Sequence, residues 1–525
     1  MAARLGEPVV MAHSTSEDLS QVELELKFDV PPAAVDALAA DLRKAHAKVQ
    51  RLQAIYFDTS DDRLAARRVV VRLRKEGSRW MQTAKASTGD AFRRLEHNAP
   101  VTTPRGGAEP ALDLSRHDGT EVGAAIREAL GSAAAQSDRP VLVERFRIDV
   151  SRLHCIERIG ESTVELALDT GSIRAGKRST PVCEFEMELK SGSAADLCAL
   201  AMVRAARDGL WLSVLSKSAR GERLLRGRAA ASSARIVKAT VPSIDADAGP
   251  AGFVVAVLDS CLAQIIGNAS EVAAGHSGEE VVHQLRIGLR RMRTALAALN
   301  GFATGIDPAW ANVLARAFRE LGAHRDAAVV VPSVLAQMAA DGVMCAWAPV
   351  PPPVLRSPGA VVRDAAFQRT LLAMLAFCHS PAVPPKALRD TPKRLRKRLA
   401  RRLDTLHARL ARDAKQFADL SEAQQHAVRK RLKRLRYLCE FATPVFGVDA
   451  VEGYLQGWRK AQDAIGLCND QRIALQALRA GARGEPGTLE AQAWLLAQIE
   501  EGVARGAKRL RKAARRPVLA DSLFR

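Results

Sequence analysis

The sequence predicts a multidomain α+β protein with a sheet-rich N-terminal part and an all-helical C-terminal part. At 525 residues, the chain is too long for one hydrophobic core. Apolar and polar residues alternate through much of 21–190, as in half-buried strands, whereas from 251 onward apolar residues recur with helical spacing. Between these parts, the Ala- and Ser-rich stretch 228–250 is typical of a linker.

The expected strands are short segments in which apolar and polar residues alternate. They are VELELKFDV (22–30), VVVRLRK (69–75), RWMQTAKAS (79–87), VERFRIDV (143–150), TVELALD (163–169) and CEFEMELK (183–190). Two helical stretches interrupt them, at 32–48 and 193–210, and Ser193 is a candidate N-cap of the second. Gly, Ser, Pro and Asp separate the strands, which favours an antiparallel sheet or a barrel.

The helical part contains an internal repeat. HQLRIGLRRMR at 283–293 aligns with HAVRKRLKRLR at 426–436 at a shift of 143 residues, and LGAHRD at 321–326 matches IGLCND at 465–470 at a shift of 144. Two related units of about 251–350 and 360–516 are therefore expected, separated by proline-rich sequence. Residues 1–20 and 517–525 are expected to form a flexible start and a tail.

A stripe of cations follows one edge of each repeated helix. The first stripe holds His283, Arg286, Arg290 and Arg293, and the second holds His426, Arg429, Lys433 and Arg436. Arginine suits bidentate phosphate recognition, and a rise of 1.5 Å per residue spreads each stripe over roughly 15 Å. Stripes facing one another across a pseudo-twofold axis would repel unless an anion lay between them. A solvated face is the alternative, and the repetition argues against it.

Charge and composition restrict the class of partner. The net charge is +20, and most of it falls after residue 228. Such a surface implies a polyanion: nucleic acid, anionic lipid or polyphosphate. Nucleic acid is disfavoured because aromatics make up only 4% of residues and are not interleaved with the cations. Scattered cysteines, with neither a signal-peptide pattern nor an uncharged apolar run of about 18 residues, predict a cytoplasmic protein without a membrane partner.

Charges of both signs share strand faces in the N-terminal part. Alternation places the following on common faces: Glu23, Glu25 and Lys27; Arg72 and Arg74; Thr83 and Lys85; Arg94 and Glu96; Arg145 and Arg147; Glu165 and Asp169; and Glu184, Glu186 and Glu188. A row of glutamates is unfavourable without cations nearby, and Mg²⁺ commonly bridges carboxylates to phosphates. A closed barrel would gather both sets of charges in one lumen. An ordinary sheet wetted on one side is the alternative.

The repeated stripes in a helical setting resemble the CHAD family over about 251–516. This resemblance implies two four-helix bundles related by pseudo-twofold symmetry, with a basic groove between them that binds inorganic polyphosphate through the eight stripe residues. One departure is that His324 and Arg325 of the first unit become Cys468 and Asn469 in the second.

The N-terminal part resembles the CYTH, or triphosphate tunnel metalloenzyme, family over about 21–227. The resemblance rests on Glu-x-Glu-x-Lys (23–27), VRLRKEG (71–77), RRLE (93–96), VELALDTGSIRAG (164–176), CEFEMELKSG (183–192) and SKSARG (216–221). It implies an eight-stranded antiparallel tunnel that hydrolyses inorganic triphosphate or a related triphosphate with Mg²⁺ or Mn²⁺. Bacterial inorganic triphosphatases that also carry a CHAD domain are the most similar group.

The CYTH resemblance also implies roles for individual residues. Glu23, Glu25, Glu184, Glu186 and Glu188 would hold the metal, and Glu23, Glu25 and Lys27 would be catalytic. Arg72, Arg74, Lys85, Arg94, Arg145, Arg147 and Lys217 would bind phosphate oxygens. The combination suggests an enzyme fused to a polyphosphate binder, with an association with polyphosphate granules. A non-catalytic polyphosphate-binding scaffold is the alternative.

Overall fold

A computed structural model describes residues 24–87, 94–102, 108–131, 140–227, 234–346, 356–379, 391–481, 486–517 and 519. The chain forms two compact units, which are considered separately. The first spans the chain as far as Val237 and adds Ile266–Gly278 and Leu371–His379, and the remainder from Lys238 onward forms the second. The predicted N-terminal segment 1–20 and most of the tail 517–525 lie outside the described residues.

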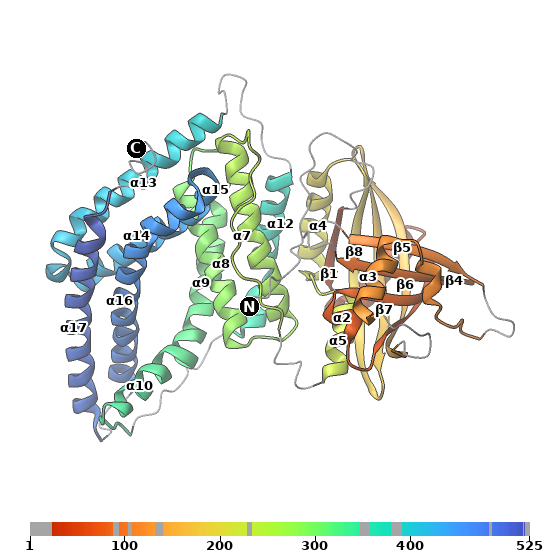
Figure 1. The fold of residues 1–525 in the computed structure, drawn as a ribbon, viewed down its shortest axis with the longest axis horizontal. Coiled ribbons are helices and arrows are strands. Elements are labelled where there is room, and N and C mark those ends of the chain that lie inside the picture. The colour runs from red at the N-terminus through yellow and green to blue at the C-terminus, as the bar shows by residue number, and fades with distance from the viewer. Residues whose placement is uncertain are drawn as a thin grey trace. The chain divides into compact units, whose positions relative to one another are not determined.

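The first unit contains a nine-stranded antiparallel sheet, which confirms the predicted sheet class (Figure 1). The strands are β1 Leu24–Asp29, β2 Lys48–Thr59, β3 Val69–Glu76, β4 Arg79–Ser87, β5 Arg94–Val101, β6 Leu142–Ile159, β7 Ser162–Ala175, β8 Arg178–Ser191 and β9 Trp211–Leu212. Their order is β5-β4-β3-β2-β6-β7-β8-β1-β9.

The sheet is not closed, so the predicted barrel was wrong in this respect. Strands β5 and β9 form its two edges. Strand β9 pairs with β1 through only Phe28↔Leu212 and Asp29↔Trp211, which offers too short a ladder to carry the sheet round to β5. Alternation along a strand identifies its buried face, but it does not report whether the sheet edges meet.

Helices cover both faces of this sheet. They are η2 Pro32–Ala34, α1 Val35–Lys44, α2 Arg63–Ala66, η4 Leu114–His117, α3 Glu121–Leu130, α4 Ala194–Asp208 and α5 Lys217–Arg226. Val71 of β3 packs with Ile126 of α3 in the core of the outer face. Leu224 of α5 packs with Phe146 and Ile148 of β6 on the opposite, inner face. Helix α5 therefore shares the inner face with the charged residues described below.

Local sequence signals account for several boundaries. The Ser193 hydroxyl accepts a hydrogen bond from the Asp196 backbone N–H and caps α4, as predicted. The loops β3–β4, β6–β7 and β7–β8 contain Gly77, Gly160 and Gly176, each with a positive φ. Two-residue hairpins need such left-handed positions, which glycine adopts without a steric cost.

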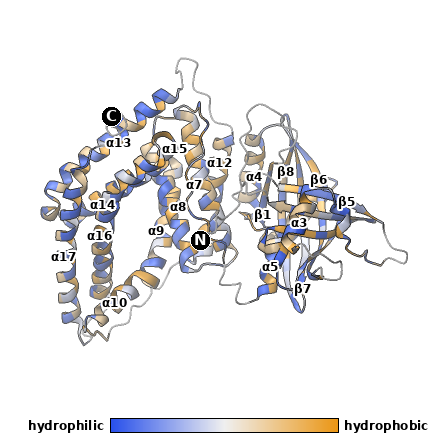
Figure 2. Cartoon of the chain, in the orientation of Figure 1, coloured by the Kyte–Doolittle hydropathy of each residue, from blue (hydrophilic) through white to orange (hydrophobic). Residues whose placement is uncertain are grey.

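The second part of the chain is helical, as predicted. Its helices are α7 Pro250–Ala273, α8 Glu279–Ala298, α9 Ala309–Arg325, the π-helix η6 Asp326–Val330, α10 Val331–Ala340, α11 Pro358–Val362, α12 Ala365–His379, α13 Pro392–Lys415, η7 Phe417–Asp419, α14 Glu422–Phe441, α15 Thr443–Phe446, α16 Val448–Gly481 and α17 Thr488–Ala514. Helix α8 packs against α9 and α14, and α14 packs against α16. Polar and apolar residues alternate around these helices (Figure 2).

Helix α7 is the most apolar of the long helices. Among the described residues it alone is long and apolar enough to cross a membrane, and 78% of its most apolar window is buried inside the structure. Buried core helices pass the same test, so this composition is weak evidence for a membrane span.

Candidate functional sites

Three acidic side chains of β8 lie on the inner face of the sheet, beside residues of β1. Glu188 pairs with Glu25, Glu186 with Lys27, and Glu184 with Asp29. On the other side of β8, Glu188 faces Glu165 and Glu184 faces Asp169 of β7. The register therefore places seven carboxylates on three adjacent strands of one face.

Lys217, the first residue of α5, neutralises the centre of this carboxylate group. Its Nζ lies 2.8 Å from Asp169, 2.7 Å from Glu184 and 2.9 Å from Glu186. Burial alone would lower the pKa of Lys217, but these carboxylates outweigh it and raise the pKa above its usual range. The sequence suggested that Lys217 binds phosphate, and the structure places it among the acids.

Further cations surround the same carboxylates. Arg152 of β6 binds Asp169 through Nε and Nη2, at 2.8 and 2.7 Å, and also contacts Glu186. Arg220 of α5 donates to Glu184 Oε1 at 2.9 Å. Neither arginine was predicted as a site residue, although Arg220 belongs to SKSARG, the motif that also contains Lys217.

Glu25 differs from its neighbours in making no hydrogen bond or ion pair among the described residues. The Glu25 side chain is exposed, yet the protein atoms that crowd around its carboxyl group still reduce its hydration. This loss of hydration, followed by the charge of Glu186, raises the pKa of Glu25 to about 7. Lys27 donates instead to the backbone carbonyl of Leu215.

Glu165 and Glu188 share a lysine near the end of β8. Lys190 Nζ lies 2.8 Å from Glu165 and 2.6 Å from Glu188. His154 Nδ1 contacts Glu165 at 2.9 Å. The charges of Glu165 and Glu188 are thus balanced by the ammonium group of Lys190, which is itself partly exposed.

The predicted phosphate-binding cations of β3 lie on the same face. Asp169 pairs with Arg152, and Arg152 pairs with Gln50 of β2. By the same alternation along β2, Tyr56 faces Arg72 and Ala54 faces Arg74. Arg72 Nη1 donates to the Tyr56 hydroxyl at 3.1 Å. One sheet face therefore carries carboxylates on β7, β8 and β1 and arginines on β3.

The other predicted cations occupy different surroundings. Lys85 of β4 binds Glu96 at 2.7 Å. Arg145 lies at a β-bulge and donates to Asp62 Oδ1 at 2.6 Å. Arg147 is on the outer face, opposite Ile55, where it binds Glu109 and Glu144, so it is separated from the arginines of β3. Glu23 and the side chain of Arg94 lie outside the described residues.

The chemistry of the acidic group suits a hard divalent cation, since Mg²⁺ and Mn²⁺ prefer oxygen ligands. The present arrangement is incomplete, because no group of three or more His, Cys, Asp or Glu side chains able to share a metal occurs in the described part of the chain. Lys217 and Arg152 lie between the carboxylates. Glu25, opposite Glu188, is the carboxylate most available to a metal.

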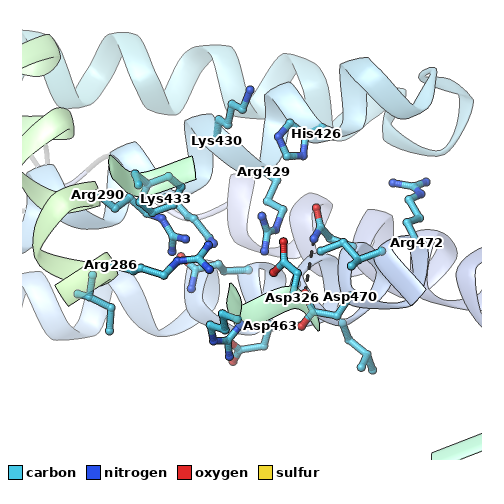
Figure 3. Close-up of a pocket in the computed structure, with 18 of the residues that line it drawn as sticks. Arg286, Arg290, Asp326, His426, Arg429, Lys430, Lys433, Asp463, Asp470 and Arg472 are labelled. Carbon is cyan, nitrogen blue, oxygen red and sulfur yellow. Dashed lines mark hydrogen bonds between the residues drawn. The ribbon is translucent and has the colours of Figure 1, made fainter. Parts of the chain in front are cut away.

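In the second unit, both cationic stripes meet in one cavity of about 1140 Å³. Its lining includes His283, Arg286 and Arg290 from α8 and His426, Arg429 and Lys433 from α14. Figure 3 shows Arg290 beside Lys433, with Arg429 extending toward Asp326 and Asp470. The last stripe members differ: Arg293 and Arg436 are not among the lining residues, and Arg436 binds Glu440 at 3.2 Å.

The cations in this cavity are crowded. Burial, followed by the charges of Arg290 and Arg429, lowers the pKa of Lys433 to about 6. Burial likewise lowers the pKa of Arg286 to about 10, with Arg290 and Arg325 adding to the effect. The carboxylates that line the cavity do not restore these pKa values, so the cavity favours a negatively charged guest.

Several lining residues were not predicted from the sequence. Asp326 and Asp470 occupy equivalent repeat positions, and both line the cavity. Phe318 and Arg472 also line it. The match between LGAHRD and IGLCND contained both aspartates and could have identified them. His324 is not among the lining residues, because its Nε2 contacts the Arg356 carbonyl at 2.5 Å.

Two protein-family models match the chain. The CYTH domain model matches residues 21–221, and the CHAD domain model matches residues 256–479. The chain carries a CYTH domain followed by a CHAD domain. The inner sheet face belongs to the CYTH domain, and the cavity belongs to the CHAD domain.

Individual relatives are more distant. An inorganic triphosphatase of Haemophilus influenzae is 27% identical over 220 residues, which are 39% of this chain and 55% of that protein. The chain thus spans about half the length of this curated relative. The solved CHAD domain of the plant Ricinus communis is 24% identical over 51% of this chain and 96% of that one, with a TM-score of 0.39. A Hippeastrum protein, named an adenylyl cyclase with a dominant triphosphatase activity, is 17% identical. The match covers 38% of this chain and 94% of that one, with a TM-score of 0.27.

Proposed function

We propose that the CYTH domain hydrolyses inorganic triphosphate, or a related triphosphate, with a divalent metal ion. The observation that carries this proposal is the shared face on which the carboxylates of β1 and β8 and the arginines of β3 lie. The similarity to an inorganic triphosphatase supports it. The metal is Mg²⁺, with Mn²⁺ as the alternative.

Within this proposal, the residues divide by charge. Glu25 and Glu188, with Glu23, Glu184 and Glu186, would hold the metal, which when bound would offset the charge on the transferring phosphoryl group. Arg72, Arg74, Lys85 and Arg94 would bind phosphate oxygens, and Lys27 would orient the substrate. Because Lys217 and Arg152 already neutralise Glu186, metal binding depends first on Glu25.

The hydrolysis proposal is tested by phosphate release from inorganic triphosphate in the presence of Mg²⁺. Arg72→Ala and Glu23→Ala are expected to reduce the rate by about 10²-fold or more. The first removes a cation that would bind phosphate oxygens, and the second removes a carboxylate that would hold the metal. Arg51→Ala is the matched control, because Arg51 lies on the neighbouring strand but binds Asp149 on the outer face. Equal release by all four proteins would contradict the proposal.

The CHAD domain is proposed to bind inorganic polyphosphate in its cationic cavity. A polyphosphate carries one negative charge on each closely spaced phosphate, and the stripes of α8 and α14 present cations from two sides. Two four-helix bundles with pseudo-twofold symmetry would account for the equivalent stripes. The protein would work in the cytoplasm, and its CHAD domain would associate it with polyphosphate granules.

Competition at physiological salt tests this second proposal. Labelled polyphosphate bound to the full chain is challenged with unlabelled polyphosphate or duplex DNA of equal phosphate concentration. Polyphosphate is expected to displace the label at much lower concentration. Equal displacement would indicate a general polyanion binder, since any polyanion binds a cationic surface at low salt.

A non-catalytic polyphosphate-binding scaffold is the second candidate, and one observation favours it. Lys217, Arg152 and Arg220 form ion pairs with Asp169, Glu184 and Glu186, so these carboxylates are balanced without a metal. Polyphosphate binding without any Mg²⁺-dependent phosphate release would establish this alternative.

A further inference from the structure

Three arginines of α8 gather around one aromatic ring of α9. The Cζ atoms of Arg286, Arg290 and Arg293 lie 4.9, 5.0 and 5.5 Å from the ring centroid of Phe318. Phe318 is half-buried and lines the cationic cavity. A cation within about 6 Å of an aromatic face is attracted by its negative electrostatic potential. The ring therefore offsets part of the repulsion among three neighbouring guanidinium groups.

Helix α9 holds Arg286 by further contacts. Arg286 Nη1 donates to the backbone carbonyls of Leu321 and Gly322, at 3.3 and 3.1 Å. Gly322 also leaves the space that the guanidinium needs, since an added Cβ would lie 3.2 Å from Arg286 Nη2. These contacts fix the start of the stripe, and Phe318 extends the support to the next two turns.

The second repeat lacks this arrangement. Phe318 corresponds to Gln462 at the shift of 144 residues that relates the α9 and α16 segments. Gln462 lines the same cavity but offers no aromatic face to Arg429 or Lys433. Arg436, the counterpart of Arg293, instead binds Glu440 and lies 4.6 Å from the ring of Tyr437. The cations of α8 are thus collected on one support, whereas those of α14 are not.

We propose that Phe318 is a positioning residue of the anion site, which holds the α8 arginines together before a polyphosphate chain arrives. This inference rests on the proposed polyphosphate binding by the CHAD domain. Without the ring, the guanidinium groups would separate through mutual repulsion, and the ligand would have to bring them together again. Ordering side chains on binding costs affinity, so arginines that are already held in place bind the ligand more tightly.

The test measures binding of a defined inorganic polyphosphate to the full-length protein by calorimetry. Phe318→Leu is expected to weaken binding about tenfold, the equivalent of losing 1.4 kcal/mol, which lies within the usual range for cation–π contacts. Phe318→Tyr keeps the aromatic face and is expected to restore binding to within twofold. Phe302→Leu is the matched control, because Arg398 lies 4.3 Å from the Phe302 ring and neither residue lines the cavity.

The salt dependence distinguishes positioning from direct phosphate contact. Phe318→Leu is expected to keep the slope of log Kd against log salt, because the number of cations that meet phosphate is unchanged, whereas Arg290→Ala lowers it by about one. If Phe318→Leu lowers the thermal unfolding midpoint, Phe318→Met replaces it in the comparison with Phe318→Tyr at a temperature where both are folded. Normal binding by the leucine or methionine variant overturns the inference alone. Absence of binding by the unaltered protein overturns the proposed function itself.

Discussion

Arg290 of α8 and Lys433 of α14 hold equivalent positions in the two helical repeats, and both line the same cavity. After burial, Arg290 is the largest influence that lowers the pKa of Lys433 to about 6. Arg429 and Arg436 add to this effect, whereas Asp470 of α16 opposes it. The free protein therefore carries a Lys433 side chain that is largely neutral at pH 7.

Polyphosphate binding is expected to take up a proton at Lys433. A bound polyanion raises the pKa of this lysine, so affinity is greatest below about pH 6 and falls as the pH rises through the pKa of the bound state. Calorimetry at pH 7 in buffers of different ionisation enthalpy measures this uptake. The Lys433→Met variant should lose it, and unchanged uptake would assign the proton to another group, such as His283 or His426, whose pKa values are also lowered by burial.

The same substitution is expected to stabilise the protein without ligand. Burial of Lys433 at pH 7 requires its ammonium group to lose a proton that it keeps in the unfolded chain. Lys433→Met removes this cost, so the free energy of unfolding at pH 7 should rise by about 1 kcal/mol. Urea denaturation measures the change. Lys430→Met is the control, since Lys430 is exposed on the same helix and its loss should change stability by less than about 0.5 kcal/mol. A loss of stability in Lys433→Met would contradict the electrostatic account of the cavity.

Lys217 is expected to be important for the stability of the CYTH domain. Lys217→Met leaves Asp169, Glu184 and Glu186 with too little positive charge, and breaking a buried ion pair in this way costs about 3 kcal/mol. Lys190→Met is the control, because its side chain is 39% exposed and its pairs with Glu165 and Glu188 should be worth less than about 1 kcal/mol. Equal destabilisation of the two variants in urea would show that the Lys217 contacts carry no special weight.

Triphosphate hydrolysis is expected to increase with pH through the titration of Glu25. Its folded-state pKa of about 7 lies above the usual glutamate value of 4.5, so the free energy of unfolding falls as the pH rises between these values. Above pH 7 the carboxylate is ionised and ready to bind a metal. Because Mg²⁺ competes with the proton, a higher Mg²⁺ concentration should move the midpoint of the pH–rate profile to lower pH. A midpoint independent of Mg²⁺ would exclude Glu25 as the group that titrates.

Local patterns identified much of the fold and of both sites. Alternation located β3 and β8, and the repeated stripes located the residues that meet in the CHAD cavity. Strand β2 was missed because Ala54, Ile55 and Tyr56 are buried in succession, which removes the alternation. The open sheet edges were also missed, because closure depends on pairing between distant strands.

Long-range contacts explain the remaining differences at the site. SKSARG was recognised as a motif, but only the fold shows that it begins a helix capped by Ser216, which brings Lys217 to the carboxylates. Arg147 shares its alternation with Arg145, yet a bulge and the register with Ile55 place it on the outer face. Phe318 carried no local signal, because its role depends on the packing of α9 against α8.

The most direct test of the account is a Mg²⁺ titration of phosphate release from inorganic triphosphate by the full-length protein and by Glu25→Gln at pH 8. We expect saturable, Mg²⁺-dependent release by the unaltered protein, and a large loss of rate with a higher Mg²⁺ requirement for Glu25→Gln. No release at any Mg²⁺ concentration, or identical titrations for the two proteins, would contradict it.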